Sequence, residues 1–328
     1  MRAAVCPTYG PPEVVHVEEV SSPALAPGQV RVRVDAAAVN FPDVLLVANE
    51  YQIKVPTPFV PGSELAGVVT EVAEGVDGVI AGDRVSGTGL VGAFAEEAVL
   101  SVDALNRIPT SVDERLAAAF GVAHRTSYHV LRSVGRLQPG DELVVLGAGG
   151  GVGLATVQLG ALLGASVTAV ASSREKLDVA ASYGAGNLID HRSGNLRQAL
   201  REVLPDGADV VVDPVGGDLS EPALRSLRWG GRLVTVGYAS GAIPKIPLNL
   251  VLIKGIQILG FEFLGFATNN ADEVRRNEAE LMDHFATGRV VPHIGAAFPL
   301  DETAAALRYV ADGRAIGKVV IDVAPSRS

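Results

Sequence analysis

Cysteine is almost absent from the 328-residue sequence, in which Cys6 is the only one. A single cysteine cannot form a disulfide within the chain, and it excludes a cysteine-rich zinc site. Positive charge is also scarce, since 27 Lys and Arg face 37 Asp and Glu, which gives a net charge of −10. This balance argues against a nucleic-acid partner, because binding a phosphate backbone requires a basic face.

Long apolar runs are missing as well. No stretch reaches the roughly 20 uninterrupted apolar residues that a membrane helix needs, and the segment from Met1 to Val5 leads into polar residues without the apolar region of a signal peptide. We therefore expect a cytoplasmic protein that does not interact with membranes.

Aromatic residues are also few, at 5%, whereas hydrophobic residues make up 48% and glycines number 37. This composition favours closely packed α/β layers.

Periodicity divides the chain into regions of different structure. Residues 1 to about 120 indicate strands and turns, with one short helix near Pro42–Val47. From about residue 140, helical stretches alternate with apolar strands, which indicates a doubly wound parallel sheet. The strands are expected at 143–146, 166–171, 188–189, 210–212, 233–236 and 256–261, and helices at 174–182, 195–204 and 219–227. Residues 262–328 break the alternation, with helices at 272–287 and 301–311 and an edge-like strand at 318–323 that could return to the first region.

A glycine-rich loop, Gly147 to Gly153, lies directly between the first apolar strand and a helical stretch. Gly150 would let a ligand approach the backbone, and Gly153 would let the helix pack closely on the strand. The helix N-terminus then offers free N–H groups to a pyrophosphate. This strand–turn–helix context predicts a dinucleotide site.

The residue after the second strand predicts which dinucleotide binds. NAD sites carry an acidic residue at this position, about 20 residues after the glycine loop, where it grips the ribose hydroxyls. Here the position is Ser172, which would not repel a 2′-phosphate, and Arg174 and Lys176 follow it. The sequence therefore predicts NADPH as the cofactor.

The chain resembles the zinc-free quinone oxidoreductase branch of the medium-chain dehydrogenase/reductase superfamily over nearly its whole length. The resemblance is carried by the glycine loop, Ser172 to Lys176, Tyr51 and the segments 27–32, 38–43, 58–67, 82–85 and 313–318. It implies a GroES-like, β-rich catalytic domain made of residues 1–122 and 263–328, and a Rossmann domain at 123–262. It further implies a cleft between the domains and commonly a homodimer paired through the strand near Ile256 to Phe261.

The resemblance also implies roles for individual residues. Asn40 and Thr126 should lie near the nicotinamide and its ribose, and Phe261 and Phe263 on the nicotinamide side. The residues expected to contact the rest of the dinucleotide are Gly150, Gly151 and Val152 at the pyrophosphate, Ser172, Lys176 and His191 at the adenosine phosphate, Tyr238 and Ser240 after the fifth strand, and Arg314 at a phosphate. Core packing is the alternative for His191, where the family often has Tyr, and for Phe263, and a surface turn is the alternative for Arg314.

The sequence differs from the zinc-dependent members of the superfamily at the positions of their metal ligands. Those relatives place a Cys ligand where Asn40 stands and a His ligand where Ser63 stands, and they carry a four-cysteine lobe. Catalytic zinc needs three protein ligands, and Glu64 and Asp43 alone do not supply them. We therefore expect no metal.

The expected reaction follows from this site. Hydride addition to a conjugated carbonyl places negative charge on the oxygen, which hydrogen-bond donors must stabilise. Tyr51 is the first candidate donor and the Asn40 amide the second, although Tyr51 could also only pack against the substrate. His124 and His129 are more often structural in such positions. We predict an NADPH-dependent reductase of a small quinone or enone; the alternatives are an enoyl-CoA reductase of the acryloyl-CoA type and a non-catalytic NADPH-binding protein.

Overall fold

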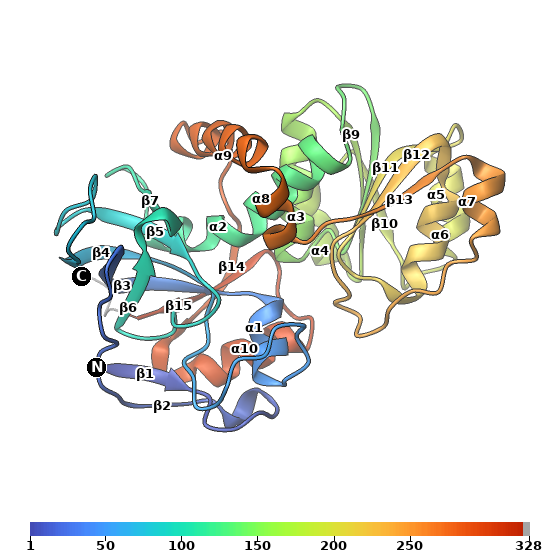
Figure 1. The fold of residues 1–328 in the computed structure, drawn as a ribbon. Helices are drawn as coiled ribbons and strands as arrows, with labels where there is room; N and C mark the ends of the chain where they lie inside the picture. Colours follow the sequence, from blue (N-terminus) through green and yellow to red (C-terminus); the bar gives the residue numbers. More distant parts are fainter. Residues whose placement is uncertain (324–328) are drawn as a thin grey trace. The chain divides into compact units, whose positions relative to one another are not determined.

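The computed structural model describes residues 1–323, which form two compact units (Figure 1). One unit contains Met1–Val122 and the segment from Val291 onward, and the other contains Ala123–Val290. The sequence predicts domain boundaries after residues 122 and 262. Helices α8 (Phe263–Asn269) and α9 (Ala271–Ala286) belong to the second compact unit.

The first unit is built on a seven-stranded sheet with the order β14-β15-β3-β4-β5-β7, in which β6 also pairs with β3. The long strand β3 alternates as predicted, because Val30, Val32 and Val34 are buried at its centre. A separate pair, β1 and β2, joins the same core. The strands of this unit are β1 (Arg2–Val5), β2 (His16–Glu19), β3 (Gln29–Val39), β4 (Glu64–Val72), β5 (Arg84–Thr88), β6 (Glu97–Ser101), β7 (Leu105–Arg107), β14 (Ile294–Pro299) and β15 (Lys318–Asp322).

The C-terminal strand β15 returns to the N-terminal sheet as predicted, but it is not an edge strand. It pairs antiparallel with β3 on one side and parallel with β14 on the other. Its residues Val319, Val320 and Ile321 are buried, which is what a strand with neighbours on both sides requires. This placement brings Lys318, the first residue of β15, level with the end of β3.

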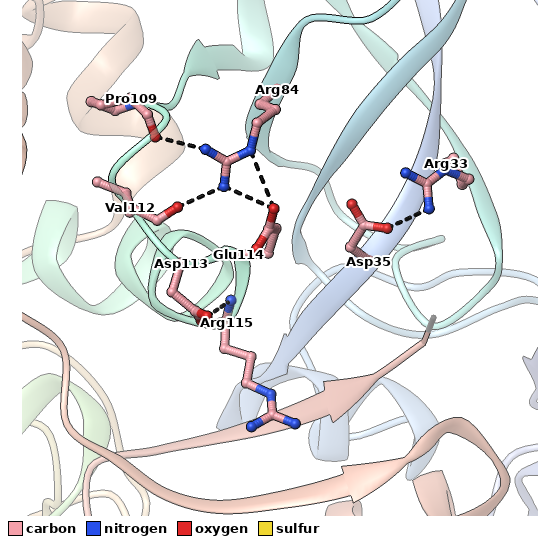
Figure 2. A network of polar contacts seen from close by, with 8 residues as sticks. All are labelled: Arg33, Asp35, Arg84, Pro109, Val112, Asp113, Glu114 and Arg115. Carbon is pink, nitrogen blue, oxygen red and sulfur yellow. Dashed lines mark hydrogen bonds and ion pairs between the residues drawn. The ribbon is translucent and has the colours of Figure 1, made fainter. Parts of the chain in front are cut away.

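Helix α2 (Glu114–His129) contains the boundary between the units, and its first half is fixed to the sheet of the first unit. Arg84 of β5 donates to the carbonyls of Pro109 and Val112 at 2.8 and 2.6 Å and to Glu114 at 2.8 Å (Figure 2). Arg115 forms a second anchor, an ion pair with Asp322 at 2.6 Å. The helix was not predicted, although Asp113, which accepts from the Arg115 N–H, followed by Glu114 is a typical helix start.

The second unit is a six-stranded, fully parallel sheet with the order β10-β9-β8-β11-β12-β13. This is the predicted doubly wound arrangement, in which the chain starts at the centre and reverses direction after three strands. Figure 1 shows α3 and α4 on one side of the sheet and α5 and α6 on the other. The strands are β8 (Glu142–Leu146), β9 (Ser166–Ala171), β10 (Asn187–Asp190), β11 (Ala208–Asp213), β12 (Leu227–Thr235) and β13 (Gln257–Gly260).

Helix length does not decide where the sequence prediction agrees with the structure, because the seven-residue α1 was predicted and the 16-residue α2 was not. Two short apolar helices, α7 and α8, were missed, because a few apolar residues do not distinguish a helix from a strand. No helix within residues 1–323 is long and apolar enough to cross a membrane. The remaining helices are α1 (Phe41–Val47), α3 (Gly151–Leu162), α4 (Arg174–Ser182), α5 (Leu196–Val203), α6 (Ser220–Arg225), α7 (Asn249–Lys254) and α10 (Thr303–Ala311).

Candidate functional site

The glycine loop forms the tight turn between β8 and α3 that the sequence predicts. Gly147 has φ +61°, in the left-handed region. A Cβ on Gly153 would lie 2.0 Å from the Gly147 carbonyl oxygen, so only glycine allows the helix to start this close to the strand. A Cβ on Gly150, in contrast, would come no nearer than 3.5 Å to another atom, so this residue leaves room above the loop. The loop therefore fits a phosphate group that approaches the backbone.

The free N–H groups at the N-terminus of α3 face the open space above Gly150. Gly150 is the residue before the helix and has no side chain to cap it, and Gly151 and Val152 form the first turn. The carbonyl of Val152 accepts from Ser127 of α2 at 3.0 Å and from Thr156 at 2.8 Å, which ties the first turn to α2. A 12-residue helix with an uncapped N-terminus is a favourable anion site.

A group of basic side chains lies at the carboxyl ends of β9 and β10. Lys176 reaches back over the glycine loop, where a Cβ on Gly149 would lie 2.6 Å from its stem, and its Nζ lies 3.5 Å from the Ser172 hydroxyl. His191 follows β10 and donates its N–H to the Ala171 carbonyl at 3.1 Å. The structure therefore brings Ser172, Lys176 and His191 to one corner of the sheet, as the resemblance implied.

Sequence reasoning missed a further member of this group, Arg192. The pKa of Lys176 is lowered, first by burial and then by the charge of Arg192. The pKa of His191 is lowered by the same two causes in the same order. Burial is the larger cause of both shifts, and the smaller contribution of Arg192 places a further positive charge near both groups, which a bound phosphate would balance. The signal was visible in the sequence, because residues that follow neighbouring parallel strands meet at one edge of the sheet.

Arg174 was expected to share this role with Lys176, and in the structure it contacts a different partner. Its guanidinium pairs with Asp178 at 2.8 Å, one helical turn further along α4, and its side chain is 79% exposed. Two residues apart on a helix, the side chains of Arg174 and Lys176 point in different directions. Arg192, rather than Arg174, is therefore the arginine that acts on Lys176.

The loops after β11 and β12 pack on each other. Tyr238 lies against Gly216, where a Cβ would be 2.8 Å from its ring, and Ser240 lies equally close to Gly217. Asp213 accepts from the N–H groups of Val215 and Gly216 at 2.9 and 2.8 Å. Asp213 thus holds the turn, while Tyr238 and Ser240 are exposed and can contact a ligand.

Phe261 and Phe263 form an aromatic cluster with Phe266 around His129. The ring of His129 lies 6.4 Å from Phe261 and 5.8 Å from Phe263, and Arg125 stacks on Phe263 at 4.5 Å. His129 is fully buried and contacts Asn277 at 3.1 Å, while His124 is 3% exposed. Both histidines therefore pack within the second unit, and packing also accounts for part of the surroundings of Phe263.

The first unit contains a buried polar cluster made of Asn40, Asp43, Ser63, Glu64 and Lys318. The ammonium of Lys318 contacts Glu64 at 2.7 Å, and the two side chains are 4% and 1% exposed. The other carboxylate oxygen of Glu64 accepts from the Val122 N–H of α2 at 2.7 Å. Asn40 follows the last residue of β3, Asp43 lies in the first turn of α1, Glu64 begins β4 and Lys318 begins β15, so the cluster joins four elements.

The amide of Asn40 is oriented without ambiguity. Its oxygen accepts from the Lys318 ammonium, and its nitrogen donates to Glu64 at 2.9 Å and to Ser63 at 3.2 Å. Both amide hydrogens are thus used within the cluster. Asn40 therefore does not provide the second free donor to a substrate that the sequence suggested; it positions Ser63 and Glu64 instead.

Three predicted residues remain. Thr126 lies in α2, belongs to the second unit and is half-buried. Tyr51 and Arg314 belong to the first unit. Tyr51 follows α1 and is half-buried against the core. Arg314 is exposed and stacks on Tyr309 at 4.6 Å, near the end of α10. Within residues 1–323, no group of three or more His, Cys, Asp or Glu side chains is placed to hold a metal ion.

Known protein families match both parts of the chain. Residues 26–110 match the alcohol dehydrogenase GroES-like domain, and residues 151–282 match the family described as zinc-binding dehydrogenase. The predicted pairing of a GroES-like domain with a Rossmann sheet is thereby confirmed.

Individual proteins match over nearly the full length. The chain is 37% identical to quinone oxidoreductase-like protein 2 homolog of Nematostella vectensis, over 98% of this chain and 88% of that one. It is 36% identical to quinone oxidoreductase-like protein 2 of Bos taurus, over 98% and 92%. Among solved structures, the quinone oxidoreductase of Escherichia coli complexed with NADPH matches with a TM-score of 0.92 and 26% identity, over 98% of this chain and all of that one.

Proposed function

Since the chain belongs to the quinone oxidoreductase branch of the medium-chain dehydrogenase/reductase superfamily and is an oxidoreductase of that family, we propose that it uses NADPH to reduce a small quinone or enone. The observation that carries the cofactor assignment is the grouping of Lys176, His191 and Arg192 beside Ser172. No carboxylate stands where an NAD site would carry one. The NADPH complex of the Escherichia coli relative supports the same assignment.

In this proposal, the chain holds each part of the cofactor with a different element. The α3 N-terminus and Gly150 bind the pyrophosphate, and Lys176 and Arg192 neutralise the 2′-phosphate. Tyr238 and Ser240 contact the dinucleotide from the loop after β12. When bound, the reduced nicotinamide supplies the hydride, and the Tyr51 hydroxyl donates a hydrogen bond to the oxygen that becomes negative.

The cofactor assignment predicts a selective effect of Arg192→Gln. Loss of one charge-assisted contact should raise the Kd for NADPH about tenfold or more and leave the Kd for NADH unchanged. Fluorescence titration measures both constants. Arg197→Gln, an equally exposed change in α5, serves as the control and should alter neither. Equal affinity of the unmodified protein for NADH and NADPH would contradict the assignment.

The acceptor class is tested by following NADPH oxidation against 1,4-quinones, enones and enoyl-CoA thioesters. Quinones or enones should turn over fastest, because conjugation spreads the charge that the site must stabilise. Turnover of enoyl-CoA alone would favour a thioester reductase, and no turnover of any acceptor would favour a binding protein without activity.

Tyr51→Phe should lower kcat for the preferred acceptor by at least about tenfold, because it removes a hydrogen-bond donor aimed at the developing charge. The Kd for NADPH should not change, since Tyr51 belongs to the first unit and the phosphate-binding residues belong to the second. An unchanged kcat would show that Tyr51 only packs against the substrate.

We also propose that the protein is a homodimer that pairs through β13. This strand is the last in its sheet and hydrogen-bonds only to β12 among the described strands. Exposed apolar side chains surround it: Trp229 at 77%, Leu248 at 75%, Leu252 at 80% and Ile253 at 67% exposure. An apolar surface beside an open strand edge is typical of a contact between copies.

Leu252→Glu should therefore convert the dimer to a monomer, as measured by light scattering after size-exclusion chromatography. Ile80→Glu replaces another exposed apolar residue, which belongs to the first unit and is 66% exposed, and should leave the mass unchanged. A monomeric unmodified protein at micromolar concentration would refute the proposed interface.

A further inference from the structure

The loop after β11 contains a buried carboxylate, Asp213, to which the proposed function gives no role. We propose that Asp213 is a positioning residue for the nicotinamide half of the cofactor, because it fixes a turn that joins the glycine loop to the loop after β12. The inference rests on the proposed function and adds how the second half of the dinucleotide is held.

The order of the strands indicates which half of the cofactor the turn serves. Lys176 and Arg192 follow β9 and β10, and the glycine loop follows β8, the next strand in the sheet. A dinucleotide with its 2′-phosphate at the first place and its pyrophosphate at the second continues over β11 and β12. The winding of the sheet also reverses between β8 and β11, where the carboxyl ends of the strands form the usual ligand site.

Asp213 acts on a ligand only through this turn. It is the last residue of β11 and is completely buried. Its Oδ1 accepts from the backbone N–H groups of Val215 at 2.9 Å and Gly216 at 2.8 Å. Its Oδ2 accepts from the hydroxyl of Ser220, the first residue of α6, at 2.5 Å. Both oxygens are thus used to hold the turn.

The backbone of the turn pairs with the backbone of the loop after β12. The Ser240 N–H donates to the Val215 carbonyl at 2.9 Å, and the Gly217 N–H donates to the Ala242 carbonyl at 2.9 Å. The two loops therefore continue the pairing of β11 with β12 beyond the ends of the strands. A displacement of the turn would displace the loop after β12 with it.

The turn also sets the place of Tyr238, which is 40% exposed. Gly216 has φ +70°, in the region that favours glycine. A Cβ on Gly216 would lie 2.8 Å from the Tyr238 ring and 2.9 Å from the Ala242 carbonyl oxygen. The ring therefore packs directly on the backbone that Asp213 holds, and its exposed part is available to the cofactor.

On its other side, the turn contacts the glycine loop. A Cβ on Gly147 would lie 2.7 Å from Cγ2 of Val215, so the Val215 side chain occupies the space beside this glycine. Asp213 holds Val215 by its N–H group. One carboxylate thus fixes the distance between the loop proposed for the pyrophosphate and the loop that carries Tyr238.

Asp213→Ala tests this role by isothermal titration calorimetry with two ligands, NADPH and adenosine 2′,5′-bisphosphate, which lacks the nicotinamide half. The Kd for NADPH should rise about tenfold or more, because two N–H groups lose their acceptor and the turn moves. The Kd for the bisphosphate should stay within about twofold. A role in overall stability alone would lower the fraction of protein that binds and leave both constants unchanged.

Two matched variants accompany this measurement. Asp213→Asn keeps an oxygen that accepts from both N–H groups, and its amide can donate to the Ser220 hydroxyl, so it should recover most of the affinity for NADPH. Asp218→Ala removes an exposed carboxylate of the same segment and should change neither Kd.

Gly216→Ala provides a second test that leaves the carboxylate in place and decides the question if Asp213→Ala does not fold. Its Cβ would meet the Tyr238 ring and the Ala242 carbonyl, so the two loops must separate. The same pattern is expected, with weaker binding of NADPH and unchanged binding of the bisphosphate.

The outcomes distinguish the two proposals. If the unmodified protein binds NADPH but both Asp213→Ala and Gly216→Ala bind it normally, or if both ligands weaken by the same factor, the role of Asp213 is wrong and the proposed function stands. Equal losses in Asp213→Asn and Asp213→Ala would also overturn it. If the unmodified protein binds neither ligand, the proposed function is wrong and the role of Asp213 with it.

Discussion

Lys318→Met should lower the free energy of unfolding by about 3–5 kcal/mol, because it leaves the Glu64 carboxylate buried without its cation. Methionine fills a similar volume, so the loss of charge rather than of packing dominates. Glu64 is 1% exposed and would keep only the N–H donors of Asn40 and Val122. Urea unfolding followed by circular dichroism measures the change.

Two further variants separate this effect from a general loss of charge. Adding Glu64→Gln to Lys318→Met should restore part of the stability, because it removes the uncompensated charge. Arg308→Met breaks the pair with Glu13 at 2.6 Å, but both side chains are largely solvated, at 39% and 57% exposure, so a much smaller change is expected. Similar losses in Lys318→Met and Arg308→Met would show that burial of the pair does not matter.

Asp43→Asn should flatten the dependence of stability on pH. The pKa of Asp43 is raised from 3.8 to about 7 in the folded protein, so between these values the folded state binds a proton that the unfolded state has released. Stability therefore falls as pH rises through this window. The loss amounts to roughly 4 kcal/mol by pH 7 and is absent in the variant, which has no proton to lose.

The measurement is a series of urea titrations between pH 4 and pH 8. The curves of Asp43→Asn and the unmodified protein should approach each other as the pH falls towards 4. Asp77→Asn, which alters an exposed carboxylate of the same unit, should leave the pH dependence of the unmodified protein in place. Parallel curves for Asp43→Asn and the unmodified protein would mean that the pKa of Asp43 is not raised in the folded protein.

The Rossmann sheet could be predicted from the sequence because its signals are local. Each strand, such as Leu143–Leu146, is a continuous apolar run that ends in glycines or polar residues, and helix ends carry caps such as Ser173 and Gly164. The place of α9 in the second compact unit could not be predicted in the same way. It depends on α9 packing against α2 through Tyr128 and Glu280, which contact each other at 2.8 Å and lie 152 positions apart.

In the candidate site too, features with local sequence signals could be predicted and contacts between distant residues could not. The glycine loop and Ser172 could be recognised because the fold brings short, adjacent segments together. The pairing of Lys318 with Glu64 could not, since 254 positions separate them and nothing local indicates that a lysine will be buried. The loss of Asn40 as a donor to substrate is equally non-local, because it depends on which acceptors surround its amide. The sequence suggested the Asn40 amide as a donor, but in the structure both of its hydrogens are donated to Ser63 and Glu64.

The stem of Lys176 rests on the glycine loop, in the space that a Cβ at Gly149 would occupy. The loop that we propose binds the pyrophosphate therefore also determines where the ammonium group of Lys176 lies. Substitutions after β9 alone, made to favour the unphosphorylated coenzyme, would leave the space above Gly149 unchanged. A change of coenzyme preference would therefore require substitutions in the glycine loop and in the residues after β9 together.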